Sequence, residues 1–500
     1  MPEQGTVQQY VLLPGGGLRA NPSTATPEVR QFFASLGAGE GAAAIEGPQL
    51  RVVDSLGPDG AALVEGSPES VLALRRAQPG VRIAPVRYYT PAVARRQAAQ
   101  RPAAAMVAPG SAVTLRVLSA GTGKAVVGAF VVAFVDFSTK SGDQGVTDAK
   151  GEVKVALGSQ HTTLDRLYVY PVDAHWSHVA PGFVATDGAT VQVQPLDLSS
   201  TDGLRHYYAN AADGAGSGVT VAVVDTGVAK HPDLVIAGGA NTVPGETPTD
   251  FGDNGQHHGT HVAGIIAARG RPPKGIRGVA PGVTLRAYRV FAKGSGSASN
   301  FAIAKAIDQA VTDGCDLINM SLGGGQVDPV LKAAVDDART GGSLCIIAAG
   351  NSDRAPVAFP ASDPTAVAVS ALGRVGTFPA DSTENDDVAG PFGTDPAEFI
   401  ASFSNVGPEL DLTGPGVGIM STVPGGFAEM SGTSMACPAV TGMAAQLLAS
   451  TDALKMARDA KRSDAMLKAV LASARSRGFA ANLEGHGLLQ PGAPSPPKHR

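Results

Sequence analysis

Short apolar runs alternate with amphipathic helical patterns from residue 203 to residue 492. The runs that predict buried strands are rich in β-branched residues and cover 219–224, 284–290, 317–320, 344–348 and 366–369. The helical patterns cover 301–310 and 330–340 and begin again at His258 and Ser434. Because strands that alternate with helices form parallel sheets, this region predicts an α/β fold with helices on both faces of the sheet.

The first 92 residues show a different pattern. Strand-like runs lie at 10–13, 61–65 and 81–86. Ser67 and Pro68 are typical of a helix start and precede a helical pattern over 71–77. Residues 1–92 are therefore predicted to form a small α+β module.

A segment rich in Ala, Pro, Gln and Arg follows the module. Residues 93–110 have this composition, which predicts a linker. The arginines at positions 95, 96 and 101 fit a processing site, but short basic groups in linkers are more often simply solvated. The Pro-rich residues 493–500 predict a disordered tail.

Residues 111–198 contain strand patterns without helical ones. These runs cover 113–118, 129–135, 153–157, 167–170 and 190–193, and Gly- and Asp-rich turns separate them. Short strands without helices predict an antiparallel β-sandwich. The pattern resembles carboxypeptidase-regulatory-like sandwiches, and its function stays open among targeting, spacing and assistance in folding.

Composition and charge narrow the class of protein. Gly and Pro are frequent, at 63 and 36 of 500 residues, and the formal net charge is −5, which argues against a general nucleic-acid binder. No apolar run approaches the ~20 residues of a membrane span. The first residues lack a basic region followed by an apolar core, so we expect a cytoplasmic protein unless it is exported by a non-standard route. Its three cysteines lie among apolar or small residues and are expected to be buried thiols.

Four short segments carry candidate chemistry. Asp-Thr-Gly at 225–227 ends a strand, and Ala-Ala-Gly-Asn at 348–351 follows another. A histidine-rich segment at 257–261 and Gly-Thr-Ser-Met-Ala at 432–436 each open a helix. A serine at a helix start lies beside unpaired N–H groups, which can stabilise negative charge on a substrate oxygen. Such a serine is usually only a cap, unless a base and an acid lie nearby.

In this order and spacing, the four segments resemble those of subtilisin-like serine proteases, the subtilase family. The resemblance runs from about residue 217 to 490 and implies a subtilisin-like fold. It implies that Asp225, His258 and Ser434 form a catalytic triad and that Asn351 completes the oxyanion hole. The end of the N-terminal module is similar to the family's propeptide. This implies a zymogen that acts on protein or peptide substrates and is inhibited by its own N-terminal module.

The resemblance also implies a substrate-binding cleft. Its expected residues are Ser321, Leu322 and Gly323 on one wall, Ala349 and Gly350 on the other, and Ala358 at the base. Small neutral residues here favour medium to large apolar side chains before the cut, whereas Asp353 at the rim would favour a basic one. Residues 296–299 lack the aromatic residue often found near a more distant pocket, which leaves its selectivity open.

No cofactor is expected, and calcium stays an open question. Asp233 matches a ligand of the family's tight calcium site, but the partner loop at 269–274 is basic and offers no carboxylate or side-chain amide. That site is therefore expected to be absent. An acidic insertion from 381 to 398 fits either a cation site or a solvated loop. A zinc site at His257, His258 and His261 is disfavoured because the His-Glu-x-x-His pattern is missing.

Two other functions stay open. A catalytically silent subtilase-fold protein would bind partners without cutting them, although no triad residue is missing. An esterase or amidase for small molecules would hydrolyse small esters and leave proteins intact.

Overall fold

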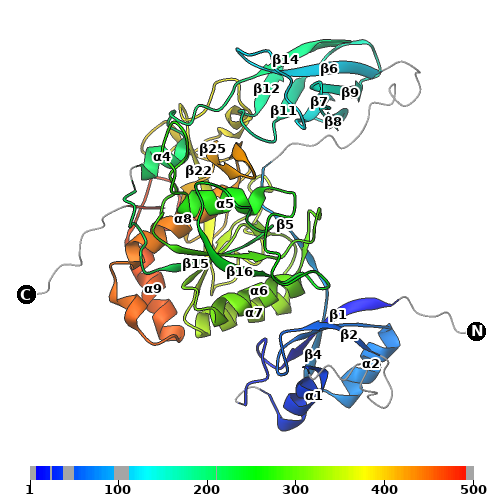
Figure 1. The fold of residues 1–500 in the computed structure, drawn as a ribbon, viewed down its shortest axis with the longest axis vertical. Coiled ribbons are helices and arrows are strands. Elements are labelled where there is room, and N and C mark those ends of the chain that lie inside the picture. The colour runs from blue at the N-terminus through cyan, green and yellow to red at the C-terminus, as the bar shows by residue number, and fades with distance from the viewer. Residues whose placement is uncertain (1–6, 23–24, 38–49, 95–111, 210, 491–500) are drawn as a thin grey trace, which may run out of the picture.

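The computed structural model describes residues 7–22, 25–37, 50–94, 112–209 and 211–490. They form an N-terminal module, a β-sandwich and a large α/β region, and the module and sandwich lie at opposite ends of the α/β region (Figure 1). Most of the predicted linker, including its three arginines, and the predicted tail lie outside the described residues.

The N-terminal module is an antiparallel sheet with two helices on one face. The strands follow the order β2-β3-β1-β4. Its elements are β1 (Gln8–Pro14), α1 (Pro27–Gly37), β2 (Arg51–Ser55), β3 (Ala62–Gly66), α2 (Pro68–Ala77) and β4 (Val81–Pro85). Because side chains alternate along a strand, Leu12 of β1 packs with Phe33 and Leu74 of the helices, whereas Val11 and Leu13 face the α/β region.

The β-sandwich is mixed, whereas the sequence predicts an antiparallel one. Its two main sheets follow the orders β12-β11-β7-β8 and β14-β6-β9, and β14 pairs with β6 in parallel. A parallel pair needs a long crossover, which the intervening strands supply. The elements are β6 (Ala112–Ser119), β7 (Phe130–Asp136), β8 (Ser141–Val146), β9 (Glu152–Ala156), β10 (His161–Thr163), β11 (Arg166–Tyr170), β12 (His178–Pro181), β13 (Val184–Thr186) and β14 (Thr190–Val193).

The α/β region is built on a largely parallel sheet, as predicted. Its order is β16-β17-β15-β19-β21-β22-β24-β28-β27, with β23 paired to β22. The strands are β15 (Thr220–Asp225), β16 (Ile236–Asn241), β17 (Thr284–Arg289), β19 (Leu317–Met320), β21 (Leu344–Ala348), β22 (Val367–Arg374), β23 (Glu398–Ile400), β24 (Leu412–Pro415), β27 (Ala474–Arg475) and β28 (Leu488–Leu489). The hairpin β25 (Ile419–Val423) and β26 (Gly426–Met430) lies outside this sheet.

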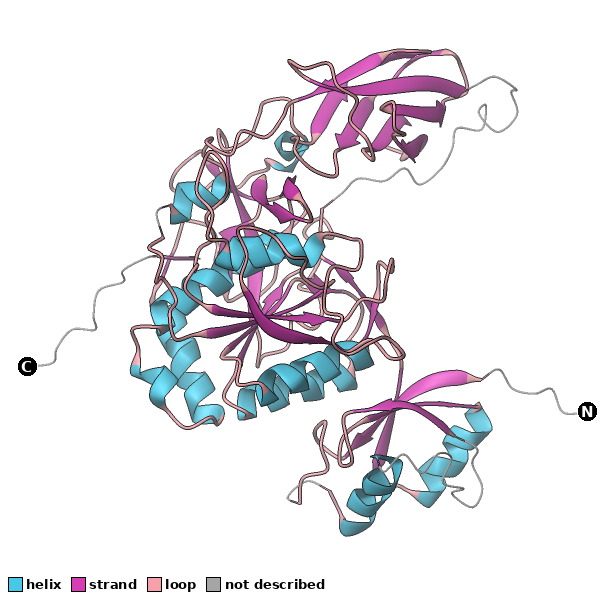
Figure 2. Ribbon diagram, viewed as in Figure 1, coloured by secondary structure: helices cyan, strands magenta, loops and turns pink. Residues whose placement is uncertain are grey.

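Helices cover both faces of this sheet, as Figure 2 shows. They are α4 (Gly203–Tyr208), α5 (His258–Ala267), α6 (Asn300–Thr312), α7 (Pro329–Thr340), α8 (Thr433–Leu448), α9 (Ala460–Ala472) and α10 (Ala481–Glu484). On one face of β15, Val221 and Val223 pack in a core with α5 and α8. On its other face, Ala222 and Val224 pack in a core with α6 and α7. Each face of the strand is therefore buried, which explains its continuous apolar run. No helix in the described ranges has both the length and the apolarity to cross a membrane.

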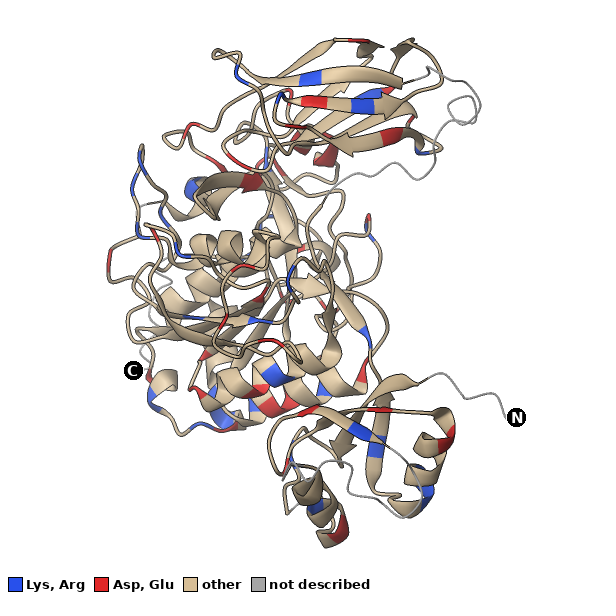
Figure 3. Cartoon of the chain, turned by 45° about the vertical axis from the view of Figure 1, so that its right-hand side comes forward, with Lys and Arg blue, Asp and Glu red and all other residues tan. Residues whose placement is uncertain are grey.

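The N-terminal module docks on helices α6 and α7. Val11 and Leu13 share a hydrophobic core with residues of both helices. Two ion pairs flank this core, Arg19 with Asp308 at 2.7 Å and Lys305 with Asp54 at 2.7 Å. In Figure 3, blue and red ribbon segments mark the Lys, Arg, Asp and Glu residues where the module meets the α/β region. Because these pairs are partly exposed, the apolar contact supplies most of the docking energy.

The acidic insertion is the docking surface of the β-sandwich, so its interpretation as a solvated loop is wrong. Its 3₁₀ helix (Thr383–Asp387) and the residues around it meet β11 and β12. Arg166 Nη1 donates to Asp386 Oδ2 at 2.9 Å, and Val179 N donates to Asp381 O at 2.9 Å. Further along, Glu398 is buried and accepts a hydrogen bond from Arg477 Nε at 2.9 Å. Asp386 and Glu398 of the insertion therefore form ion pairs with arginines of the same chain.

Candidate active site

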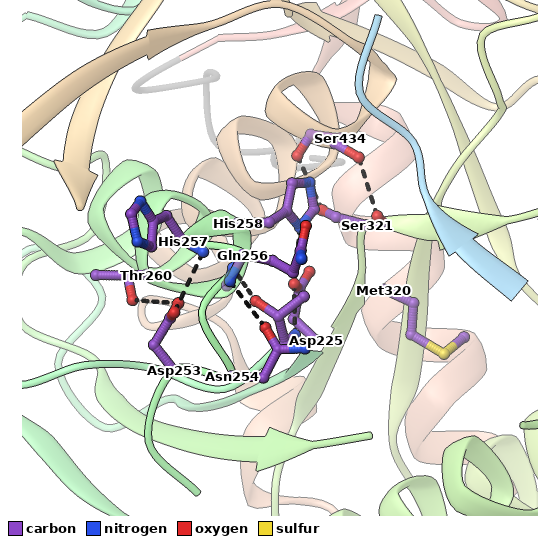
Figure 4. Close-up of polar contacts among 12 residues, drawn as sticks. Asp225, Asp253, Asn254, Gln256, His257, His258, Thr260, Met320, Ser321 and Ser434 are labelled. Atoms are coloured by element: carbon purple, nitrogen blue, oxygen red, sulfur yellow. Dashed lines mark hydrogen bonds and ion pairs between the residues drawn. The ribbon is translucent and has the colours of Figure 1, made fainter. Parts of the chain in front are cut away.

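Three polar side chains meet at one edge of the parallel sheet. Asp225 is the last residue of β15, His258 is the first residue of α5, and Ser434 is the second residue of α8. The carboxyl ends of parallel strands share one edge, and the helices that begin there bring their first residues to it. Figure 4 shows the imidazole of His258 between Asp225 and Ser434.

The acid and the imidazole form a buried hydrogen-bonded pair. His258 Nδ1 lies 2.7 Å from Asp225 Oδ1, and the same oxygen accepts from Thr226 N at 2.6 Å. This contact fixes the ring and leaves His258 Nε2 without a hydrogen-bond partner within the described part of the chain. The Ser434 hydroxyl donates to the carbonyl oxygen of Ser321 at 2.9 Å. The arrangement offers a proton acceptor beside an alcohol in a water-poor site.

The start of α8 is joined to the loop after β21. Asn351 Oδ1 accepts from Thr433 N at 3.0 Å and from Thr433 Oγ1 at 2.9 Å. Since the oxygen is engaged by these donors, Asn351 Nδ2 is left to donate on the other side of the amide. Gly432 has a φ of 153°, and a Cβ there would lie 2.4 Å from the carbonyl oxygen of Ala92, so a side chain is excluded at this position.

That carbonyl oxygen of Ala92 lies between the side chain of Asn351 and the backbone of Ser434. It accepts from Asn351 Nδ2 and, at 3.2 Å, from the Ser434 backbone N–H. On either side, Ala92 N donates to Ser321 O at 3.2 Å and Ala94 N donates to Ser431 O at 2.9 Å. The Ala92–Val93 peptide bond therefore lies beside Ser434, with backbone hydrogen bonds on both of its sides.

A strand just before Ala92 holds this pose. Strand β5 (Tyr88–Pro91) pairs antiparallel with β18 (Ala298–Ser299) on one side and with β20 (Leu322–Gly323) on the other. Sequence analysis missed β5, although it placed these residues within the N-terminal module. The signal present was weak: two tyrosines followed by Thr-Pro-Ala, too short for a periodicity to show.

The expected walls of the cleft come together around β5. The predicted wall residues Ser321, Leu322 and Gly323 contact the segment from Thr90 to Ala92 through backbone pairing. Ala358 lies across from them. Its Cβ is 3.8 Å from the position that a Cβ would take on Gly323, and 3.2 Å from the position that one would take on Gly350, which follows Ala349. Asp353 lines a cavity beside Val93 and Ala94, and its effect on the residue preferred before the cut stays a prediction.

The more distant pocket is filled by an aromatic residue of the module. Tyr89 is 1% exposed and packs in one apolar cluster with Ala298 and Phe301. Its hydroxyl donates to Asp328 Oδ2 at 3.1 Å, and Asn300 Nδ2 donates to the same oxygen at 2.8 Å. The pocket wall at 296–299 lacks an aromatic side chain, and the ring of Tyr89 takes up the space.

The neighbouring polar groups are engaged elsewhere. His261 Nε2 lies 3.1 Å from Ile419 O and 3.2 Å from Ala428 O, and burial lowers the pKa of this imidazole to about 3, so it is a neutral donor. Burial raises the pKa of the Cys437 thiol, which excludes a thiolate nucleophile. Asp233 Oδ2 accepts from Ile276 N at 2.9 Å, and no cluster of three metal-ligating side chains occurs in the ranges described.

A buried and a partly buried carboxyl group lie together beside the site. Glu384 of the acidic insertion and Glu429 of β26 both lie within hydrogen-bond distance of Ser177 Oγ, at 3.1 and 3.0 Å. Ser431 Oγ also lies 3.1 Å from Glu384 and 3.2 Å from Glu429. Burial and the charge of Glu384 raise the pKa of Glu429 well above its usual value.

Replacing Glu429 by glutamine is expected to stabilise the fold progressively as pH rises. The pKa of Glu429 is higher in the folded protein than in the unfolded chain. Its contribution to the free energy of unfolding is therefore fully present below the pKa of the unfolded chain and is lost as pH rises through the pKa of the folded protein. Glutamine stays neutral throughout. The thermal unfolding midpoint, followed from pH 4 upward, should separate the two proteins increasingly. The exposed Glu409→Gln is the control, and parallel curves for wild type and Glu429→Gln would contradict the expectation.

Comparison with known proteins places these features in a family. A sequence model of the subtilase family matches residues 216–487. M-protease of Shouchella clausii (strain KSM-K16) is 37% identical over 324 residues, covering 63% of this chain and 77% of that protein. Subtilisin Savinase of Lederbergia lenta is 43% identical over 232 residues, covering 46% of this chain and 76% of that protein. Alkaline elastase YaB of Bacillus sp. (strain YaB) is 44% identical over 232 residues, covering 46% of this chain and 54% of that protein.

Proposed function

The chain belongs to the subtilase family and is a serine endopeptidase, and we propose that Asp225, His258 and Ser434 are its catalytic triad. We propose further that Asn351 and the Ser434 backbone N–H form its oxyanion hole, and that the chain is a zymogen that cuts itself between Ala92 and Val93. Subtilases need no organic cofactor.

One observation carries the proposal. The carbonyl oxygen of Ala92 accepts hydrogen bonds from Asn351 Nδ2 and from Ser434 N, while the backbone on both sides of the bond is held by Ser321 and Ser431. A small-molecule esterase has no use for a cleft that pairs with an extended peptide over several residues. The alternative of a small-molecule esterase predicts no cut after Ala92.

The geometry supports acyl transfer in two steps. The Ser434 hydroxyl would leave the carbonyl of Ser321, pass its proton to His258 Nε2 and attack the carbonyl carbon of Ala92. His258 would then donate that proton to the nitrogen of Val93 as the peptide bond breaks. Asp225 would hold the ring and stabilise the imidazolium, and the two N–H donors would stabilise the oxyanion. Water would release the acyl group by the reverse roles.

Self-cleavage would leave the module bound. Its docking depends on side chains such as Val11, Leu13 and Tyr89, which do not involve the cut bond. The released module would therefore stay in the cleft as a product inhibitor until it dissociates or is degraded. The mature enzyme would begin at Val93 and retain the β-sandwich.

Replacing Tyr89 by alanine is expected to weaken this inhibition. Truncation of a buried tyrosine at the centre of an interface costs about 2 kcal/mol or more, or roughly 30-fold in the dissociation constant. Dilution of the self-cleaved protein releases the module and with it peptidase activity. In a dilution series, Tyr89→Ala should become active at a protein concentration about 30-fold higher than wild type does.

Tyr88 provides the matched control because it is the preceding residue of the same strand and is 62% exposed. Tyr88→Ala should show the wild-type dilution curve. Mass spectrometry would first establish that both variants are cut. Identical dilution curves for Tyr89→Ala and wild type would contradict an anchoring role for Tyr89.

A further inference from the structure

A cavity lies beside the residues that follow the Ala92–Val93 bond. It has a volume of about 490 Å³ and is bordered by Val93 and Ala94. Asn351, Ser431 and Phe403 of the α/β region form one part of its wall. The other part belongs to the β-sandwich, and the cavity therefore exists only because the two regions meet there.

The sandwich contributes an aromatic surface to this cavity. Phe134, Phe137, Tyr168 and Tyr170 line it, and Lys140 lies at the turn that follows β7. These rings order one another: Tyr168 and Tyr170 stack with centroids 6.2 Å apart, and Phe137 meets Phe134 edge to face at 5.2 Å. They lie on the face of the sheet that points away from the sandwich's own core.

Contacts with the acidic insertion fix this surface in place. Arg166 bridges the two regions, because its Nη1 donates to Asp386 Oδ2 at 2.9 Å while its guanidinium lies 4.0 Å from the centroid of the Phe137 ring. The hydroxyl of Tyr168 also donates to Asp386. A ring surface held by hydrogen bonds at its edge is preorganised for a ligand and loses little entropy on binding.

The path of a substrate leads into this cavity. Ala94 N donates to Ser431 O at 2.9 Å, so the second residue after the bond is held extended at the cavity's border. We propose that the β-sandwich supplies a substrate subsite that takes a large aromatic side chain two or three positions after the cleaved bond. The inference rests on the proposed function, since it assumes that substrates follow the path of residues 92–94.

Aromatic chemistry fits the lining better than a charged side chain does. Phe137 and Tyr170 offer accessible ring surface, backed by Phe134 and Tyr168, which are 1% and 0% exposed. An aromatic pair adds about a 3- to 10-fold preference beyond area burial. Lys140 and the carboxylates of Asp353 and Asp387 border the same cavity, so a single charge of either sign would meet both attraction and repulsion. The tyrosines and Ser431 add polar atoms to the lining, so a bound aromatic side chain with a polar edge would also fit.

The test compares two substrates with the self-activated full chain. A peptidyl 4-nitroanilide ending in Tyr-Thr-Pro-Ala has no residue after the cut and reports the proposed function alone. Internally quenched peptides continue the same sequence with Val and then carry Phe, Ala, Lys or Glu at the second and third positions. We expect kcat/KM for Phe to exceed that for Ala by about 3- to 10-fold.

Variants of the aromatic surface test its role. Phe137→Ala and Tyr170→Ala should bring the Phe-to-Ala ratio of kcat/KM close to one. Phe137→Leu, which keeps most of the apolar volume without a ring, should lower it partly, and thermal unfolding would show that each variant is folded. Val146→Ala is the control because Val146 lies on β8 of the same sandwich and is 60% exposed.

Each outcome is decisive. An unchanged ratio in folded Phe137→Ala and Tyr170→Ala would overturn the subsite, and a preference for Lys or Glu in wild type would overturn its aromatic chemistry. Hydrolysis of the anilide alongside either result would leave the proposed function intact. Failure to hydrolyse the anilide at all would overturn the proposed function and the subsite together.

Discussion

Replacement of Ser434 by alanine is expected to keep the 500-residue chain intact and to remove its peptidase activity. Ser434 presents the hydroxyl beside the Ala92–Val93 bond, and its Oγ is buried against the carbonyl of Ser321. Loss of the nucleophile in an enzyme with this triad lowers kcat by about 10⁶-fold. The fold should tolerate the change, since it removes one hydrogen bond worth about 1 kcal/mol. Intact-mass and N-terminal analysis of both purified proteins would measure the cut.

The wild-type chain should yield a fragment ending at Ala92 and a second fragment beginning at Val93. Ser450→Ala, in the exposed turn just after the same helix, should be cut like wild type. A wild-type cut after Arg96 or Arg101 instead would show that the observed pose of Ala92 is not the one that reacts. A cut at Ala92 in purified Ser434→Ala would contradict the role of Ser434.

The α/β fold could be predicted because several strands of the sheet, including its central ones, carry their own signal. The run that becomes β15 is apolar at every position from Val221 to Val224, which only burial on both faces explains. The candidate site came from the resemblance to a family, and the strand ends and helix starts agree with it. Asp225 and His258 each sit at such a boundary in the sequence, and a parallel sheet gathers those boundaries at one edge. The pairing of His258 with Ser434 rather than with another serine depended on the resemblance to a family.

The features that sequence analysis missed depend on partners far along the chain. Asp386 is one of several carboxylates in a row, and a local pattern cannot show that Arg166, 220 positions earlier, neutralises it. Strand β5 is only four residues long and exists because β18 and β20 pair with both of its edges. The parallel pairing of β14 likewise follows from the closure of the sandwich and not from the strand's own residues.

Replacement of Asn351 by alanine is expected to lower kcat by about 10²–10³-fold with little change in KM. Asn351 Nδ2 donates to the Ala92 carbonyl, and this hydrogen bond strengthens as negative charge develops on the oxygen, so its loss falls on the transition state. The side chain also accepts from Thr433 N at 3.0 Å, and alanine removes that support as well.

Asn351→Asp separates the two roles of this side chain. It keeps an oxygen for Thr433 but replaces the donor with a second oxygen, so activity should fall at least as far as in the alanine variant if donation to the oxyanion is what matters. Asn482→Ala, which removes an exposed amide on α10, is the control. Steady-state kinetics with the anilide ending in Tyr-Thr-Pro-Ala would measure kcat and KM separately. A rise in KM with kcat preserved would mean that Asn351 binds the ground state, and recovery of activity in Asn351→Asp would mean that it serves only to hold Thr433 in place.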